Sequence, residues 1–119
     1  MRLRKLKLAL FATFLFFCSR AHAQSHSVSL TWTASTDSVS GYYIYRLGGT
    51  CPTSGTSGFT RITATVVTGT AYTDTAVTAG SYCYYATSVL NGVESVPSNL
   101  ASAVILPAPP TALSVSGTN

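Results

Sequence analysis

The chain has 119 residues, a length that predicts one domain, and only 8% of them are charged. Its formal net charge is +4, but five of its seven basic residues lie within the first 20 positions, which are expected to be removed. The remaining two arginines, Arg46 and Arg61, stand against three carboxylates and leave a net charge of −1, which removes the basic footprint that nucleic-acid binding requires.

Residues 1–23 have the layout of a secretory signal peptide. Residues 1–7 are basic, residues 8–18 are apolar, and Ala21 and Ala23 supply the small side chains for cleavage after Ala23. The apolar run is too short for a stable membrane-spanning helix. A retained anchor and a lipoprotein signal at Cys18 are alternatives, although the residue before Cys18 is large. We expect an exported chain, secreted, periplasmic or at the cell surface, that has no membrane attachment after cleavage.

Two cysteines, Cys51 and Cys83, remain in the mature chain. An even number of cysteines in an exported protein predicts a disulfide, which would stabilise the fold by about 3–4 kcal/mol in the chain-entropy model. Two free thiols are the alternative. Two cysteines with no nearby histidine make a poor metal site, so no metal is expected.

In the mature chain, apolar and polar residues alternate within short segments, and no segment shows a convincing helical period of apolar residues. The predicted strands are residues 28–33, 41–46, 59–67, 71–76, 80–90 and 100–106. Asn91-Gly92 is the strongest hairpin signal, because both residues tolerate the positive φ that a type I′ turn needs. Several short strands with this spacing of turns predict an all-β sandwich of two antiparallel sheets.

Side chains alternate across a strand, so each predicted strand has two faces. The residues assigned to the structural core are Trp32, Tyr42, Ile44, Tyr72, Tyr82 and Tyr84. Trp32, the only tryptophan, shares its face with two aliphatic residues of its strand, although a surface binding tryptophan is the alternative. Tyr43, Tyr45 and Tyr85 are expected together on the outer face of one sheet.

Five motifs follow one another along the chain. They are VSLTW at 28–32, GYYIYR at 41–46, YTDT at 72–75, GSYCY at 80–84, and GVES at 92–95 with Ser98-Asn99. In this order and spacing they resemble a fibronectin type III domain, especially the Ser/Thr-rich versions in exported bacterial proteins, over residues 26–106. The resemblance implies an immunoglobulin-like sandwich. It also implies that Trp32 is the core tryptophan of the family's strand B, and that the hydroxyl of Tyr82 bonds nearby backbone as a tyrosine corner.

The chain departs from the family pattern at its first strand. Almost no residues precede Val28 in the mature chain to form strand A, whereas residues 107–119 hold a Pro-rich lead and an apolar pair, Leu113 and Val115, as such a strand would. One interpretation is a linker and tail at the start of a second module, after a domain that spans residues 24–106. The other is that the tail adds to the vacant edge of a neighbouring copy, which predicts weak self-association.

The cysteine pair is the second departure, since the family does not generally carry one. In the family's fold, strand C ends near the start of strand F. The resemblance therefore implies that Cys51 and Cys83 approach each other and pin the Gly48–Gly58 loop to the sheet, with Cys83 on the outer face.

Residues for catalysis are scarce in the mature chain. It has one histidine, His26, which lies near the new N-terminus and is expected to be mobile. Asp37 and Asp74 are expected to be turn or loop residues that cap backbone amides. The chain has no Gly-rich phosphate loop, and we expect neither catalysis nor a cofactor.

The resemblance implies a non-catalytic exported module that acts as a spacer or as a protein–protein or adhesion unit, with a protein or glycan partner at the cell surface. The alternative is a carbohydrate-binding accessory module that uses Tyr43, Tyr45 and Tyr85 as an exposed face. A third interpretation of these tyrosines is that cross-strand aromatic pairs simply stabilise the sheet.

Overall fold

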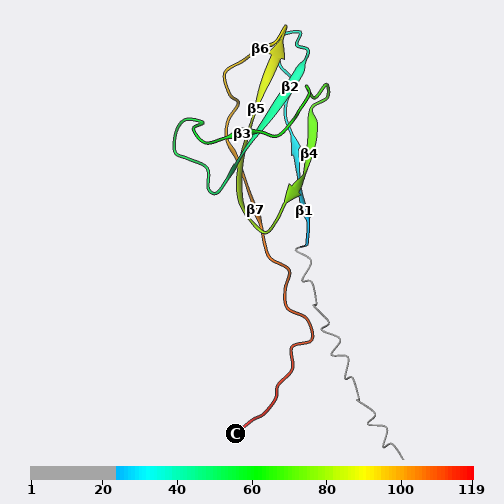
Figure 1. Cartoon of the computed structure of the whole chain (residues 1–119), viewed down its shortest axis with the longest axis vertical. Helices are drawn as coiled ribbons and strands as arrows, with labels where there is room; N and C mark the ends of the chain where they lie inside the picture. The colour runs from blue at the N-terminus through cyan, green and yellow to red at the C-terminus, as the bar shows by residue number, and fades with distance from the viewer. Residues whose placement is uncertain (1–23) are drawn as a thin grey trace, which may run out of the picture.

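The computed structural model describes residues 24–119, and all of their regular structure is β (Figure 1). The strands are β1 (His26–Thr31), β2 (Gly41–Gly48), β3 (Thr60–Arg61), β4 (Ala71–Val77), β5 (Gly80–Leu90), β6 (Val93–Glu94) and β7 (Ala101–Ile105). Over this range the chain forms no helix, and hence none long and apolar enough to cross a membrane. The predicted signal peptide lies outside the described residues.

The strands form two antiparallel sheets. β1 and β4 make one sheet, in which Leu30 lies opposite Tyr72. In the other, β2 and β5 pair along the whole of β2, with Tyr45 opposite Tyr85. β3 pairs with the free edge of β2, while β6 and β7 pair with β5. Figure 1 shows β1 and β4 on one side of the domain and β2, β5 and β7 on the other. The arrangement is all-β and consistent with the predicted sandwich.

Alternation along the strands builds the core between the sheets. Tyr42 and Ile44 of β2 are buried, and Tyr84 of β5 is 2% exposed. The Trp32 ring, just after β1, lies edge-on to Tyr42 with ring centroids 5.3 Å apart. Such edge-to-face aromatic pairs contribute about 0.5–1.5 kcal/mol beyond their buried area, so this contact ties the two sheets together.

Three residues assigned to the core, Trp32, Tyr72 and Tyr82, are only half-buried. Trp32 and Tyr72 belong to the two-stranded side of the domain, where few neighbouring strands cover them. Tyr82 lies near the start of β5. Its hydroxyl accepts a hydrogen bond from the Thr78 N–H at 3.1 Å and donates one to the Thr78 carbonyl at 3.1 Å. This is the type of backbone contact that the resemblance implies for a tyrosine corner.

Two segments differ from the predicted strands. Residues 59–67 form a strand with β2 only at β3, followed by one backbone hydrogen bond from the Ile62 N–H to the Ile44 carbonyl at 2.9 Å and by a single bridge between Val67 and Tyr42. The ladder stops because the side chain of Thr63, rather than its backbone, accepts a hydrogen bond from the Ile44 N–H at 3.2 Å. His26 is not in a mobile start: it is the first residue of β1 and lies opposite Val77, so pairing with β4 holds it.

The predicted hairpin at Asn91-Gly92 is confirmed. Asn91 has a φ of 50° and Gly92 a φ of 76°. Two consecutive positive φ values are what a type I′ turn requires, and this turn matches the right-handed twist of the strands that it joins. The turn connects β5 to β6 with Leu90 opposite Val93, and it thereby sets the position of Glu94.

The two-stranded sheet leaves the outer edge of β1 open. Among residues 24–119 nothing pairs with the outer edge of β1, whose only partner is β4. β7 ends at Ile105, and residues 107–119 are exposed and form no strand. Figure 1 shows this C-terminal tail leaving the domain at the end where β1 begins.

Candidate functional site

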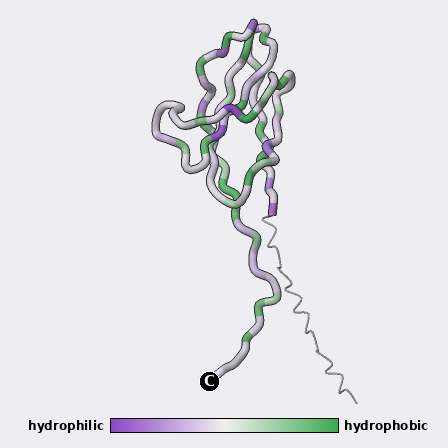
Figure 2. The backbone as a smooth tube through the Cα atoms, in the orientation of Figure 1, coloured by the Kyte–Doolittle hydropathy of each residue, from purple (hydrophilic) through white to green (hydrophobic). Residues whose placement is uncertain are grey.

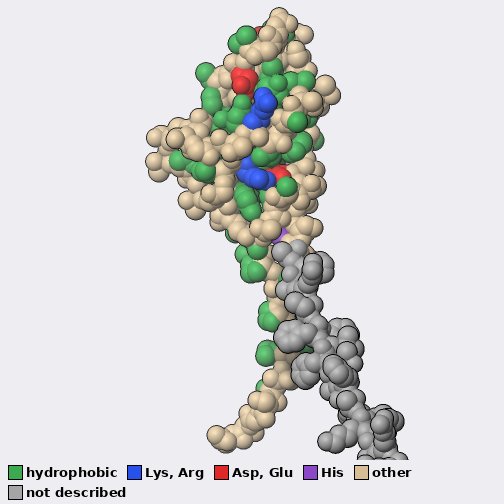
Figure 3. Space-filling view, in the orientation of Figure 1, with side chains coloured by type: hydrophobic (Ala, Val, Ile, Leu, Met, Phe, Trp, Pro, Cys, Tyr) green, Lys and Arg blue, Asp and Glu red, His purple; other side chains and the backbone are tan. Residues whose placement is uncertain are grey.

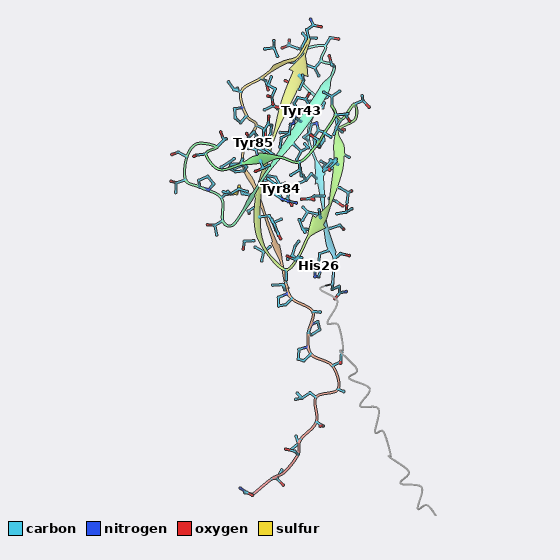
Figure 4. The ribbon with its side chains drawn as sticks, viewed as in Figure 1. His26, Tyr43, Tyr84 and Tyr85 are labelled. Carbon is cyan, nitrogen blue, oxygen red and sulfur yellow. A yellow bond between two sulfur atoms is a disulfide. The ribbon has the colours of Figure 1, made fainter. Side chains whose placement is uncertain are left out.

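The outer face of the larger sheet gathers the tyrosines that the sequence assigns to it. Tyr45 and Tyr85 lie opposite each other on β2 and β5, and their rings stack with centroids 4.6 Å apart and planes 8° from parallel. Tyr43 lies two residues before Tyr45 on β2 and therefore faces the same way. Figure 4 shows Tyr43 and Tyr85 on these neighbouring strands, with His26 at the far end of the domain. We call the group of Tyr43, Tyr45 and Tyr85 the tyrosine face.

A disulfide fastens a loop over one end of the tyrosine face. Cys51 and Cys83 form the predicted bond, with Cα atoms 5.0 Å apart. Cys83 shares the outward orientation of Tyr85, yet it is 0% exposed because the loop after β2 covers it. The same loop brings the Phe59 ring to 4.9 Å from the Tyr85 ring, tilted by 59°. The loop therefore supplies a fourth aromatic ring to the site.

One carboxylate closes the other end of the face. Glu94 of β6 accepts hydrogen bonds from the Tyr45 hydroxyl at 2.5 Å and from the Thr87 hydroxyl at 2.8 Å. Burial, with this hydrogen bond to a carboxylate, raises the pKa of Tyr45 from 10.0 to about 12. The two donated hydrogen bonds, that from Tyr45 first, lower the pKa of Glu94. The pair is therefore a neutral phenol donating to an ionised carboxylate over the whole physiological range.

One cation covers the third tyrosine. The guanidinium of Arg61, on β3, lies over the Tyr43 ring at 4.3 Å from its centroid. A cation at this distance is attracted by the electron-rich ring face, with a strength of about 0.5–1 kcal/mol at exposed sites. Figure 3 shows that charged side chains are few on this side of the molecule and that hydrophobic side chains surround them.

A separate polar cluster lies between the sheets. Asp74 of β4 accepts hydrogen bonds from Arg46 at 2.7 Å and from the Tyr84 hydroxyl at 2.9 Å. The expectation that Asp74 is a turn or loop residue is wrong, because it lies within a strand and is 3% exposed. It does accept a hydrogen bond from a backbone amide, the N–H of Ala76 at 3.2 Å. Burial and the hydrogen bond to Asp74 raise the pKa of Tyr84, and the hydrogen bond to Asp74 raises that of Arg46. This cluster is a structural clamp, since Asp74 and Tyr84 are buried between the sheets and only Arg46 reaches solvent.

The structure brings together every residue proposed for the tyrosine face, but it leaves them half-buried where the carbohydrate alternative requires exposed rings. Sequence reasoning missed two contributors, Phe59 and Glu94. The hairpin at Asn91-Gly92 was a usable signal for Glu94, because a two-residue turn fixes the register of the following strand. No local pattern marks Phe59, which reaches the face from a loop.

No group of three or more His, Cys, Asp or Glu side chains gathers into a possible metal site within residues 24–119. Comparison of the chain with family models, with curated proteins and with solved structures finds no match in any of the three.

Proposed function

We propose that this chain is an exported, non-catalytic module of the fibronectin type III kind that acts as a spacer or as a protein–protein or adhesion unit. The order of strand pairing is the observation that carries the proposal. One sheet pairs β1 with β4, and the other runs β3-β2-β5 with β6 and β7 beyond. This separation resembles that of an immunoglobulin-like sandwich, in which strands B and E lie in one sheet and strands C, F and G in the other, and the resemblance supports the proposal. Export is inferred from the signal-like residues 1–23.

The contacts of the tyrosine face favour a protein partner over a glycan. A sugar ring stacks on a free, flat aromatic face. Here Tyr45 and Tyr85 stack on each other, Phe59 packs on Tyr85, and Arg61 covers Tyr43. Tyrosine and arginine in this setting are the residue types that dominate protein–protein hot spots.

The disulfide adds to the same proposal. It ties the loop that carries Phe59 to β5, so the aromatic residues are held in place before any partner arrives. A contact surface that is already ordered loses less conformational entropy on binding. A rigid, weakly charged module with an ordered contact face suits a spacer that also binds protein.

The proposal can be tested by measuring binding. Residues 24–119 are immobilised and exposed to a panel of exported and extracellular proteins, and the same chain is applied to a glycan array. The variant Arg61→Ala/Tyr85→Ala disrupts the tyrosine face, and Thr73→Ala, exposed on the other sheet, is the matched control. Saturable binding of a panel protein that the control keeps and the double variant loses supports the protein–protein role. Binding to nothing supports the spacer role. Glycan binding that the double variant loses would overturn the proposal in favour of the carbohydrate-binding alternative.

A further inference from the structure

The outer edge of β1 is open and unprotected. The backbone N–H of Trp32 donates to the Thr70 carbonyl at 3.0 Å, so Trp32 turns its backbone groups toward β4. In an antiparallel pair these directions alternate along the strand, and Ser29 and Thr31 therefore turn their backbone N–H and C=O groups toward the opposite, free edge. Proteins commonly guard such an edge with charged residues or proline. β1 has neither: its sequence from His26 to Thr31 is HSVSLT.

A hollow lies beside this edge, between the two sheets. One part, of about 100 Å³, is lined by Leu30, Trp32, Ile44 and Tyr84 among others. A second part, of about 230 Å³, adjoins it along Trp32 and Ser98. The indole nitrogen Nε1 of Trp32 is buried and has no hydrogen-bond partner within the described part of the chain. The indole N–H can only donate a hydrogen bond. The hollow therefore lacks an acceptor for this N–H and apolar side chains that would occupy its volume.

The C-terminal tail has the pattern of a strand but pairs with nothing. Leu113 is 95% exposed and Val115 is 80% exposed. They alternate with Ser114 and Ser116, so in an extended chain they share one face. Figure 2 shows hydrophobic stretches along this tail, outside the domain. Ala112 has a φ of 55°, and pairing as a strand would return it to the extended region that suits an alanine.

The tail is better placed to reach a second copy than its own β1. Residues 107–110 include three prolines, which hold a chain extended at about 3.1 Å per residue and oppose a reversal toward the domain. Figure 1 shows the tail running away from the domain. Two copies repel each other little, because residues 24–119 have a net charge near −1 and residues 107–119 have no charged side chain.

We propose that residues 111–116 of one copy pair with the free edge of β1 in a second copy and place Leu113 and Val115 over the hollow at Trp32. The added strand supplies the missing backbone partners of Ser29 and Thr31, and its carbonyl and hydroxyl oxygens are acceptors for the indole N–H. The contact joins two different surfaces, so it builds head-to-tail chains, or closed pairs when the exchange is reciprocal. This inference goes beyond the proposed function, because the contact is made at the edge of β1 and not at the exposed side of the tyrosine face.

Sedimentation velocity over a concentration series tests the donor. Residues 24–119 are compared with Leu113→Asp/Val115→Asp and with Thr118→Asp/Asn119→Asp, which adds the same charge to the tail but spares the apolar pair. The wild type and the Thr118/Asn119 variant are expected to assemble as concentration rises, and the Leu113/Val115 variant to remain monomeric. A wild type that is monomeric throughout, or a Leu113/Val115 variant that assembles as well as the wild type, would overturn the proposal.

Tryptophan fluorescence tests the acceptor. Trp32 is the only tryptophan of the chain, and a peptide of residues 107–119 contains no aromatic residue. Added to the Leu113→Asp/Val115→Asp chain, this peptide is expected to shift the Trp32 emission to the blue in a saturable way, and a peptide with both aspartates to have no effect. An unchanged emission contradicts strand addition at β1. An Arg61→Ala/Tyr43→Ala variant alters the tyrosine face without touching a residue that lines the hollow, and it should still assemble, so failure of the proposed function and failure of this inference are separable.

Discussion

Replacing Asp74 by alanine removes the acceptor at the centre of the clamp between the sheets. The Tyr84 hydroxyl then loses its hydrogen bond in a position that is 2% exposed, which costs about 1–3 kcal/mol. Loss of the ion pair with Arg46 costs less, about 1 kcal/mol, because the arginine side chain is 26% exposed and water can replace its partner. The free energy of unfolding should fall by about 2–4 kcal/mol, a large part of the roughly 5–15 kcal/mol typical of a domain.

Urea unfolding of the oxidised chain, followed by Trp32 fluorescence and by far-ultraviolet circular dichroism, measures this loss. The midpoint should move down by about 1–2 M urea with an unchanged m-value, since the mutation alters stability and not the surface exposed on unfolding. The control is Thr73→Ala, the exposed neighbour of Asp74 on the same strand, which should stay within about 0.5 kcal/mol of the wild type.

The clamp can also be replaced as a whole. Arg46→Met, Asp74→Leu and Tyr84→Phe together remove all the polar groups that need one another, and a buried ion pair is often exchanged for apolar side chains at little cost. This triple variant should therefore be clearly more stable than Asp74→Ala. If Asp74→Ala unfolds within about 0.5 kcal/mol of the wild type, or if the triple variant is no more stable than the single one, the reasoning from unpaired buried groups is refuted.

Three further predictions concern other parts of the domain. Cys51→Ala/Cys83→Ala should lower the free energy of unfolding by about 3–4 kcal/mol, because the bond links residues 32 positions apart, and urea midpoints equal to those of the oxidised wild type would contradict this. Gly41→Ala should cost roughly 1–3 kcal/mol, since its Cβ would lie 2.5 Å from a backbone oxygen, whereas Gly69→Ala, which meets nothing within 4 Å, should be nearly neutral in thermal unfolding. Burial and a hydrogen bond to a carboxylate raise the pKa of Tyr45 from 10.0 to about 12, so its neutral hydroxyl stabilises the fold below pH 10 and this contribution is lost as the pH rises through 12. Tyr45→Phe should therefore lose less stability than the wild type between pH 10 and pH 12, and parallel pH profiles of the urea midpoint would contradict the assignment.

The face on which each tyrosine lies could be read from the sequence. Strand alternation in GYYIYR and in GSYCYYA places Tyr43, Tyr45 and Tyr85 together and puts Tyr42 and Tyr84 on the opposite side, as the structure has them. The Asn91-Gly92 turn and the pairing of the two cysteines were also predictable, because each depends on the chemistry of one or two residues.

The extent of burial was not predictable in the same way. Trp32 and Tyr72 have the parity of core residues, yet they are half-buried, because the number of strands beside them decides how well they are covered. Aspartate is a residue type common in turns, but Asp74 is buried in β4. It is tolerated there because Arg46 and Tyr84 of the other sheet donate hydrogen bonds to its carboxylate.

The sequence by itself determined where most of the strands lie, which faces they present and where the chain turns, because these depend on neighbours along the chain. Residues 59–67 are the exception, since contacts with β2 limit their strand to β3. Only the tertiary structure decided that Phe59, Arg61 and Glu94 engage the tyrosine rings, and that a hollow opens beside the free edge of β1. Those features depend on the register of strands and on the path of loops that are distant in sequence. They follow from the packing of the whole domain, which no short segment encodes.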